Sequence, residues 1–261
     1  MGEYTVSKRS KKIVGNIFNM DCVFFMRKLS SNSIDLVVTS PPYNCGIAYD
    51  IYQDNLSWED YLSWCRTWLK EIKRVLKPDG RLALNVLMEM GIENNKIRVS
   101  PFAEFYNVLK EISFNTFGAV TWLESTRSTN SAWGSWKSPS SPYVYNPTEV
   151  VIFAYKDQWK KLNKGESTIS KEEFIQATSG IWRLHAETRP STIANFPVSL
   201  PKRCIELLTW KNDIVYDPFG GGGTTAIACL QTERRWVITE ISKDYCKVAK
   251  KRIQKEKSLK C

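Results

Sequence analysis

The sequence of 261 residues has little of the chemistry that binds metals or crosses membranes. It contains a single histidine, His185, and its seven cysteines form no Cys-x-x-Cys pair, so no metal site is expected. The scattered cysteines are expected to be reduced thiols. No apolar run is long enough to span a membrane, no secretory signal is visible and no internal repeat is present. These absences predict a metal-free protein of the cytoplasm that has no membrane partner.

The composition favours a globular chain with an anionic partner. A hydrophobic content of 43% is enough for a sizeable core. The formal net charge of +10 favours a polyanion, because basic side chains neutralise phosphates and release counterions. A basic surface also keeps a protein soluble, so the charge alone leaves the partner open.

Strand and helix signals alternate along the chain, which predicts an α/β fold with a mostly parallel sheet. We expect one domain over 1–261, in which about 124–189 forms a long polar loop and a charged insertion. Strands are expected at 12–18, 34–39, 81–87, 117–123, 149–155, 213–216 and 236–239, and helices at 21–29, 101–112, 200–210, 224–230 and from Ser57 onward.

The stretch Ser40-Pro41-Pro42-Tyr43 follows the expected strand at 34–39. The two prolines stiffen this loop, remove two N–H donors and leave their carbonyls free as acceptors. A hydroxyl and an aromatic ring stand beside them, so the loop suits a planar group that carries an N–H, such as an amino-bearing nucleobase. A Pro-Pro turn after a strand is also ordinary punctuation, and the tetrapeptide alone leaves both interpretations open.

A second motif begins at Asp217 and contains four consecutive glycines between an expected strand and an expected helix. Glycines let the backbone approach a ligand closely, and the helix N-terminus offers it free N–H groups. Glu240 ends the next strand, where a nucleotide-binding unit keeps the acid that holds ribose hydroxyls. No Gly-Lys-Ser/Thr follows, which argues against a phosphate-gripping loop. The alternative is a plain glycine turn with an exposed glutamate.

The two motifs follow strands of one sheet, so both are expected to face the same crevice. S-adenosylmethionine fits the glycine-rich loop, since it is an adenosine with a methionine carboxylate in place of phosphates. Methyl transfer to an exocyclic amine fits the pair.

With these motifs the chain resembles the beta class of amino-methylating DNA methyltransferases. The resemblance rests on NMDCVFFMRKLSSNSIDLVVTSPPYN, GSWKSPSSPYVYNPTEVVIFAYK, ANFPVSLPKRCIELL and IVYDPFGGGGTTAIACL, in this order, with RRWVITEIS after them. It covers about 13–253. It implies a Rossmann-like fold of S-adenosylmethionine-dependent methyltransferases with a circularly permuted motif order, and a small target-recognition insertion. It also implies a prokaryotic restriction-modification system.

The resemblance assigns roles to individual residues. It makes Ser40, Pro41, Pro42 and Tyr43 the catalytic loop. Contacts to the cofactor are implied for Asp21, Thr39, Phe196, Pro197, Asp217, Phe219, Gly221, Gly223, Thr224 and Glu240. The chain departs from the family at three positions: Gly222 replaces a common Ser or Ala, Thr192 a frequent His, and Ile238 a frequent Gly.

In this family SPPY usually accompanies methylation of cytosine N4, and DPPY or NPPY that of adenine N6, with exceptions. We therefore expect methyl transfer to the N4 amine of a cytosine flipped out of duplex DNA. The Ser40 hydroxyl and the Pro41 carbonyl would accept the amine protons, and Tyr43 would stack on the base. The alternatives are adenine N6, an RNA or protein amide substrate, and a non-catalytic nucleic-acid-binding module.

DNA contacts are expected from the loop at 124–147, through Arg127, Trp133, Trp136 and Lys137; a packed, Trp-rich surface loop is the alternative. Double-stranded DNA is the expected partner. The short insertion suggests a short recognition site or help from a second copy in a homodimer. The family also suggests a cognate restriction endonuclease that acts separately.

Overall fold

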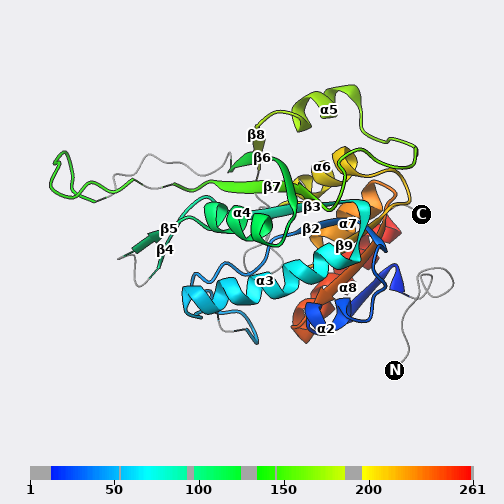
Figure 1. Ribbon diagram of the computed structural model, residues 1–261, viewed down its shortest axis with the longest axis horizontal. Helices are drawn as coiled ribbons and strands as arrows, with labels where there is room; N and C mark the ends of the chain where they lie inside the picture. The colour runs from blue at the N-terminus through cyan, green and yellow to red at the C-terminus, as the bar shows by residue number, and fades with distance from the viewer. Residues whose placement is uncertain are drawn as a thin grey trace.

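The architecture is built on one eight-stranded sheet in the order β1-β10-β9-β2-β3-β7-β6-β8 (Figure 1). The computed structural model describes residues 13–52, 54–92, 97–124, 134–144, 146–185 and 196–259. Its strands are β1 (Asn16–Asn19), β2 (Ile34–Thr39), β3 (Leu76–Leu87), β6 (Asn115–Glu124), β7 (Glu149–Tyr155), β8 (Ile181–Leu184), β9 (Ile214–Asp217) and β10 (Arg235–Glu240). Within this sheet β7 runs antiparallel to both neighbours, and the other pairs are parallel, as the alternation of signals predicts.

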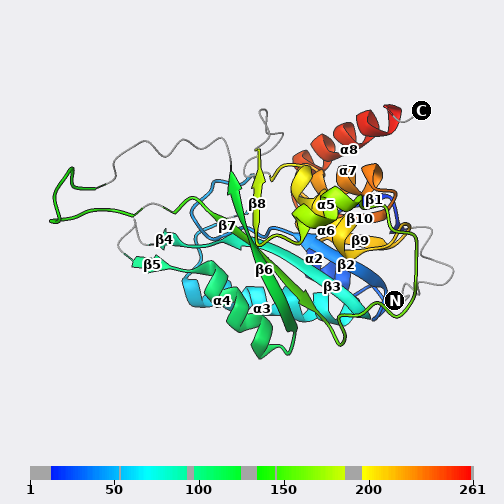
Figure 2. The same ribbon diagram turned by 90° about the horizontal axis from the view of Figure 1, so that it is seen from above.

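Helices cover both faces of the sheet, because its strands alternate their side chains between two cores (Figure 2). On β2, Val37 packs into one core, whereas Leu36 and Val38 pack into the other. The first core lies under α2 (Cys22–Met26), α3 (Trp58–Val75) and α4 (Pro101–Glu111). The second lies under α6 (Ser199–Leu208), α7 (Thr224–Gln231) and α8 (Lys243–Ser258). In the described part of the chain, no helix is both long and apolar enough to cross a membrane.

Helix α3 shows how the sequence pattern becomes packing. The Ser57 hydroxyl accepts the N–H of Asp60 at 3.1 Å, so this predicted cap is confirmed. Tyr61, Cys65 and Trp68 recur at helical spacing and are completely buried. Burying one such large side chain contributes about 1.5–3 kcal/mol relative to exposure. The helix is therefore a rigid support for whatever its buried face touches.

The stretch at 124–189 contains structure that the sequence did not predict. Helix α5 (Lys171–Ala177) is followed by β8, which pairs in parallel with β6 from Thr121 to Glu124. Trp182 of β8 is fully buried in the second core. A separate hairpin, β4 (Met90–Ile92) and β5 (Ile97–Val99), was also not predicted. The charged stretch after β7 thus returns to the main sheet and adds its last strand.

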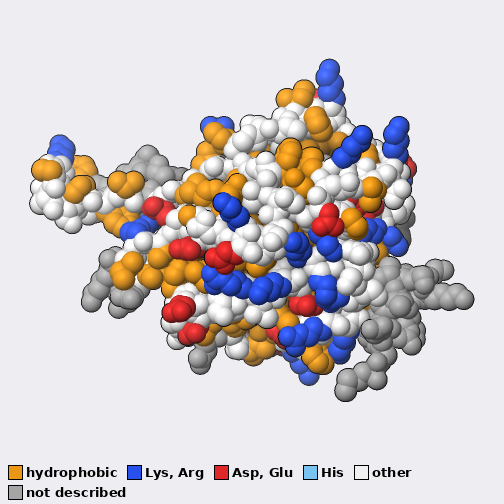
Figure 3. Space-filling view, in the orientation of Figure 1, with side chains coloured by type: hydrophobic (Ala, Val, Ile, Leu, Met, Phe, Trp, Pro, Cys, Tyr) orange, Lys and Arg blue, Asp and Glu red, His pale blue; other side chains and the backbone are white. Residues whose placement is uncertain are grey.

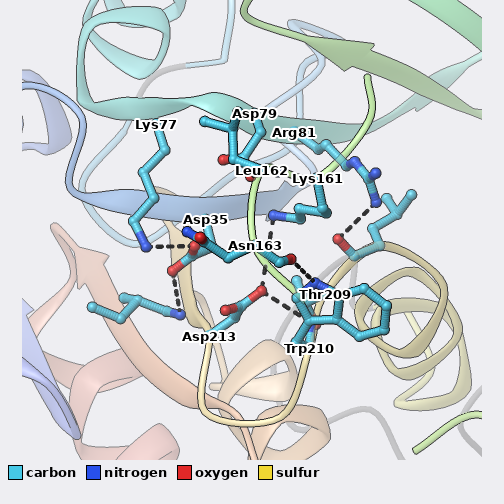
Figure 4. Close-up of polar contacts among 12 residues, drawn as sticks. Asp35, Lys77, Asp79, Arg81, Lys161, Leu162, Asn163, Thr209, Trp210 and Asp213 are labelled. Atoms are coloured by element: carbon cyan, nitrogen blue, oxygen red, sulfur yellow. Dashed lines mark hydrogen bonds and ion pairs between the residues drawn. The ribbon is translucent and has the colours of Figure 1, made fainter. Parts of the chain in front are cut away.

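A strap, residues 159–166, holds this stretch to the edge of the sheet where the parallel strands begin (Figure 4). Arg81 of β3 donates to the Trp159 carbonyl at 2.6 Å, and the Leu162 N–H donates to Asp79 at 2.9 Å. The Lys161 ammonium lies 3.8 Å from the Asp213 carboxylate. Burial lowers the pKa of Lys161 and raises the pKa of Asp213, so the pair is held out of water.

Asp35 adds a second carboxylate to this buried cluster and further raises the pKa of Asp213. The Lys77 ammonium lies 2.6 Å from the Asp35 carboxylate, and Asp35 also accepts the Ile214 N–H at 2.9 Å. The cluster therefore depends on having a cation beside each carboxylate.

The substitution Lys161→Met should lower the free energy of unfolding by about 1–3 kcal/mol at neutral pH, because it leaves a largely buried carboxylate without its cation. The loss should shrink as the pH falls toward 4. In the folded wild type Lys161 lowers the pKa of Asp213, which burial raises. Without Lys161 that pKa is raised further, so the folded variant takes up the proton at a higher pH and regains more stability than the wild type as the pH drops. Urea unfolding of wild type, Lys161→Met and the exposed neighbour Lys160→Met measures this. Equal stability of the two variants would contradict it.

Candidate active site

Four strands end beside one another and bring the predicted motifs together. β9 pairs in parallel with β2 and with β10, and β1 pairs with β10. The carboxyl ends of parallel strands meet at one edge of a sheet, which is where ligands bind in open α/β folds. The loops after Asn19, Thr39, Asp217 and Glu240 therefore surround one space, at the edge opposite the strap.

A cavity of about 260 Å³ lies between these loops. Of the residues predicted to bind a cofactor or act in catalysis, eight line it: Asp21, Ser40, Pro42, Phe196, Phe219, Gly221, Thr224 and Glu240. The remaining wall comes from Cys22, Tyr49, Asp50, Ile51, Tyr52, Trp64, Pro218, Gly220, Ile241, Ser242 and Tyr245. Rings, carboxylates and backbone N–H groups thus share one lining.

Six other predicted residues lie outside the lining: Thr39, Pro41, Tyr43, Pro197, Asp217 and Gly223. Asp217 is a buried connector between motifs. It accepts from the Thr39 hydroxyl at 2.8 Å, the Thr225 hydroxyl at 2.6 Å and the Phe219 N–H at 3.1 Å. Burial raises the pKa of Asp217 to about 6, and the hydroxyl donors oppose that rise. Its place behind the wall fits a role in holding the loops.

The glycine-rich loop is folded around Glu240. The two carboxylate oxygens of Glu240 accept the N–H of Gly221 at 2.8 Å and of Ser242 at 2.7 Å. Burial raises the pKa of Glu240, while these N–H donors lower it. Each oxygen keeps a lone pair for a ligand hydroxyl. Gly223, with a φ of +79°, occupies the N-cap of α7 in a conformation that favours glycine.

Arg252 of α8 supports the same loop and was not predicted. Its guanidinium donates to the Gly222 carbonyl at 2.8 Å and to the Thr224 hydroxyl at 3.1 Å. The family usually has a Ser or Ala at the place of Gly222, and here that peptide is held by α8. No motif in the sequence marks this contact, because a lone arginine in a basic helix has no distinctive spacing.

The Ser40–Tyr43 tetrapeptide is held from two sides. The Tyr61 hydroxyl of α3 donates to the Pro42 carbonyl at 2.7 Å, so the prediction that both proline carbonyls are free is wrong for Pro42. The Tyr43 hydroxyl lies 2.5 Å from the Ser40 hydroxyl. Tyr43 is only 9% exposed and packs in the first core, so its stacking on a base stays a prediction.

Residues 49–52 line one side of the cavity, and the segment that carries them is closed by a pair of hydrogen bonds. Asn44 and Leu56 exchange two hydrogen bonds, both of 2.8 Å. Farther along, the Ser242 hydroxyl donates to Asp50 at 2.6 Å, which joins this segment to the loop after β10. Tyr49 and Tyr52 of the segment face the cavity. The sequence did not predict that this segment borders the cavity, because the hydrogen bonds that hold it there join residues distant in sequence.

The structure describes two of the four residues that were predicted to bind DNA. Arg127 and Trp133 lie outside the described residues. Trp136 and Lys137 lie on an arm, residues 134–144, that projects from the body in both ribbon views (Figures 1 and 2). Trp136 is 70% exposed, which contradicts the alternative of a packed tryptophan at this position. Its ring lies 5.5 Å from the Lys137 ammonium.

On the face that Figure 3 shows, basic and acidic side chains are interspersed, and the arm ends in hydrophobic side chains with a basic group. In the part of the chain that the structure describes, no group of three or more His, Cys, Asp or Glu could hold a metal ion. The side chains that line the cavity carry hydroxyls, carboxylates and rings, together with the thiol of Cys22.

Comparison with known proteins shows a family. Residues 34–251 match the model of a DNA methylase family, the N6- and N4-methyltransferases. The type II methyltransferase M.MjaVI of Methanocaldococcus jannaschii is 43% identical over 162 residues, covering 62% of this chain and 81% of that protein. M.ScaI of Streptomyces caespitosus, also a type II methyltransferase, is 28% identical over 252 residues, covering 92% of this chain and 81% of that protein.

Solved structures share the architecture. The protein TTHA0409 of Thermus thermophilus, in complex with S-adenosyl-L-methionine, has a TM-score of 0.75 at 23% identity, and the match covers 92% of this chain and 95% of that one. PvuII DNA methyltransferase, described as cytosine-N4-specific, has a TM-score of 0.72 at 20% identity, with 93% and 90% covered. The predicted Rossmann-like methyltransferase fold is confirmed.

The cavity wall contains a steric constraint that a variant can test. A Cβ at position 220 would lie 1.7 Å from Cγ2 of Ile238, a fully buried and β-branched side chain. We expect Gly220→Ala to lower stability by about 1–3 kcal/mol through overpacking, and to weaken ligand binding by displacing the loop. Thermal unfolding and calorimetric titration with S-adenosylmethionine measure both effects.

Gly118→Ala is the matched control, because nothing lies within 4 Å of a Cβ there. Adding Ile238→Ala to Gly220→Ala should remove the clash and recover part of the loss, which a double-mutant cycle quantifies. Equal stability of Gly220→Ala and Gly118→Ala would contradict the constraint.

Proposed function

The chain belongs to the DNA methylase family of N6- and N4-methyltransferases, and from that premise we propose that it methylates the N4 amine of cytosine at specific sites in duplex DNA. The observation that carries the choice of base is Ser40. It is the first residue of the catalytic tetrapeptide, and it lines the cavity beside Pro42. Ser40 is a neutral hydroxyl at the position where an Asp or Asn usually accompanies adenine N6.

S-adenosyl-L-methionine is the cofactor, and it supplies a methyl group activated on a sulfonium. The lining fits such a molecule. Glu240 has spare lone pairs for ribose hydroxyls, and Asp21 places a second carboxylate in the cavity. The rings of Phe196 and Phe219 supply apolar walls for the base and the methionine chain. Tyr49 and Trp64 add π faces suited to a cationic centre.

The tetrapeptide would prepare the amine for attack. The N4 lone pair of cytosine is delocalised into the ring, so the free amine is a weak nucleophile. Acceptors for both amine protons, the Ser40 hydroxyl and the Pro41 carbonyl, favour a pyramidal nitrogen whose lone pair points at the methyl group. The nitrogen would form its bond to the methyl carbon as the bond to sulfur breaks, and the resulting methylated ammonium would then release a proton to water. Holding the amine and the methyl group in the correct geometry would account for most of the rate enhancement.

No covalent intermediate on the enzyme is needed for this reaction. Cys45 is the thiol that follows the tetrapeptide most closely, and burial together with Asp54 raises its pKa to about 11. A thiol with that pKa stays protonated at neutral pH, and the thiolate is the nucleophilic form. The reaction therefore runs through the amine itself.

The target base has to leave the duplex to reach Ser40. The arm at 134–144 supports this step, since Trp136 and Lys137 present an exposed ring and a charge away from the body. We assign DNA contact to the arm and reading of the site to the stretch around α5 and β8. We also propose that a second copy of the chain completes recognition, and that a separate restriction endonuclease acts on the same DNA site. The reaction would take place in the cytoplasm of a prokaryote, where the DNA lies.

The base is identified by product analysis. The protein should transfer labelled methyl groups from S-adenosyl-L-methionine to unmethylated duplex DNA, and digestion to nucleosides should yield N4-methylcytosine. N6-methyladenine would overturn the cytosine assignment. Label on matched RNA but not on DNA would point to the RNA alternative. Calorimetric binding of cofactor and DNA without transfer would point to a non-catalytic module.

Two variants test the assigned roles. Ser40→Ala should lower kcat by about 10- to 100-fold with cofactor affinity unchanged, since it removes one acceptor of the amine.

Glu240→Ala should weaken cofactor binding by about 10-fold or more, because it removes a carboxylate partner. Single-turnover methylation and calorimetry measure these effects. Full turnover in Ser40→Ala, or unchanged cofactor affinity in Glu240→Ala, would contradict the corresponding role.

A further inference from the structure

Behind Ser40 lies a chain of polar side chains that ends on a carboxylate. The Ser40 and Tyr43 hydroxyls are 2.5 Å apart, and the Tyr43 hydroxyl donates to Oε2 of Glu149 at 2.9 Å. The amide nitrogen of Asn85 donates to the Tyr43 hydroxyl at 3.0 Å and to the same Glu149 oxygen at 2.5 Å. Glu149 begins β7 and Asn85 lies near the end of β3, so the one antiparallel strand places this carboxylate at the active edge.

The carboxylate decides which way every hydrogen bond in the chain points. The Tyr43 hydroxyl has two acceptors within reach, Oε2 of Glu149 at 2.9 Å and the Asn85 backbone carbonyl at 3.3 Å. An ionised carboxylate only accepts, and it is the nearer and stronger acceptor, so the single proton of the Tyr43 hydroxyl goes to Glu149. The amide of Asn85 must present its nitrogen, because its oxygen would repel the carboxylate. The Tyr43 oxygen then has only lone pairs left. The proton in its 2.5 Å contact with Ser40 therefore belongs to Ser40.

The surroundings favour this arrangement. Burial, with Glu149 nearby, raises the pKa of Tyr43 well above its usual value, so the phenol keeps the proton that it donates. Asn85 is buried and cannot exchange its role with water. A hydrogen bond to an ionised acceptor is roughly twice as strong as a neutral one, which holds the direction of the chain.

We propose that Glu149 is a positioning residue which, through Tyr43, commits the Ser40 proton inward, so that Ser40 presents only lone pairs to the target amine. The inference rests on the proposed transfer of a methyl group to an amine, whichever base carries that amine. Ser40 then acts as an obligatory acceptor of an amine N–H. These hydrogen bonds thus place the negative charge of Glu149 two hydrogen bonds away from Ser40, which carries no charge of its own.

Protonation of Glu149 would reverse the direction of the hydrogen bonds from Glu149 through Tyr43 to Ser40. A carboxylic acid donates to Tyr43, Tyr43 donates to Ser40, and Ser40 turns its proton into the cavity, where it opposes the N–H of the amine. The rate at saturating DNA and cofactor should therefore fall on the acid side as Glu149 takes up a proton.

The test is Glu149→Gln, which keeps the size of the side chain and removes the fixed direction, because an amide both donates and accepts. Its kcat for total methyl incorporation into DNA should fall by about 10- to 100-fold. The Kd for cofactor, the KM for DNA and the thermal midpoint should stay those of wild type. The acid limb of the kcat–pH profile should disappear, and Glu149→Asp should restore part of both the rate and that limb.

Glu111→Gln is the matched control, since its carboxylate pairs with Arg66 at 2.8 Å on the exposed face of α3 and α4. It should leave rate and pH profile unchanged. Tyr43→Phe breaks the same chain, so adding Glu149→Gln to it should cost nothing further in kcat.

Three results would overturn the proposal: kcat of Glu149→Gln within about twofold of wild type with the acid limb intact, additive losses in the double variant, or a loss of kcat that is matched by losses of cofactor affinity and thermal midpoint. Incorporation of label does not depend on which base is modified. A wild-type product of N6-methyladenine would therefore remove the cytosine assignment and leave this proposal standing.

Discussion

One buried carboxylate joins the two halves of the active site. Asp217 ends β9 and accepts hydroxyls from Thr39, the last residue of β2, and from Thr225 in the first turn of α7. The Ser40–Tyr43 tetrapeptide starts at the residue after Thr39, and the glycine-rich loop starts at the residue after Asp217. Folding raises the pKa of this carboxyl to about 6, so its ionised form is held against its preference for water. Three hydrogen-bond donors offset the free energy of burying this charge. The same hydrogen bonds hold the two loops at a fixed distance from each other.

The sequence predicted the parts of this site that are local in the chain. The tetrapeptide after β2, the glycine turn before α7 and Glu240 at the end of β10 are visible because strand, turn and helix signals lie next to one another. Ser57 was predicted as a helix cap for the same reason. Eight of the predicted residues line the cavity.

The parts that the sequence did not reveal are contacts between distant residues. Tyr43 and Glu149 are 106 positions apart, and Asp50 and Ser242 are 192 apart. Nothing in the residues around Glu149 distinguishes it from a glutamate that opens an ordinary strand. β8 was missed because four residues in a charged stretch have too little pattern to indicate a strand, and its partner β6 is remote. Side-chain partners of this kind follow from the order of strands in the sheet, which is a property of the whole fold.

The contact between Gly220 and Ile238 also bears on how such a chain changes over generations. A side chain at position 220 is incompatible with the isoleucine and compatible with a smaller residue, so the effect of the first substitution depends on whether the second has happened. A lineage that carries Ile238 loses stability if it gains a side chain at 220 first, and it loses less if position 238 has already become smaller. The reverse order passes through a protein with a displaced cofactor loop. The two positions are separated by 18 residues in sequence, but they are in contact, so the order of the two substitutions affects the stability of the intermediate protein.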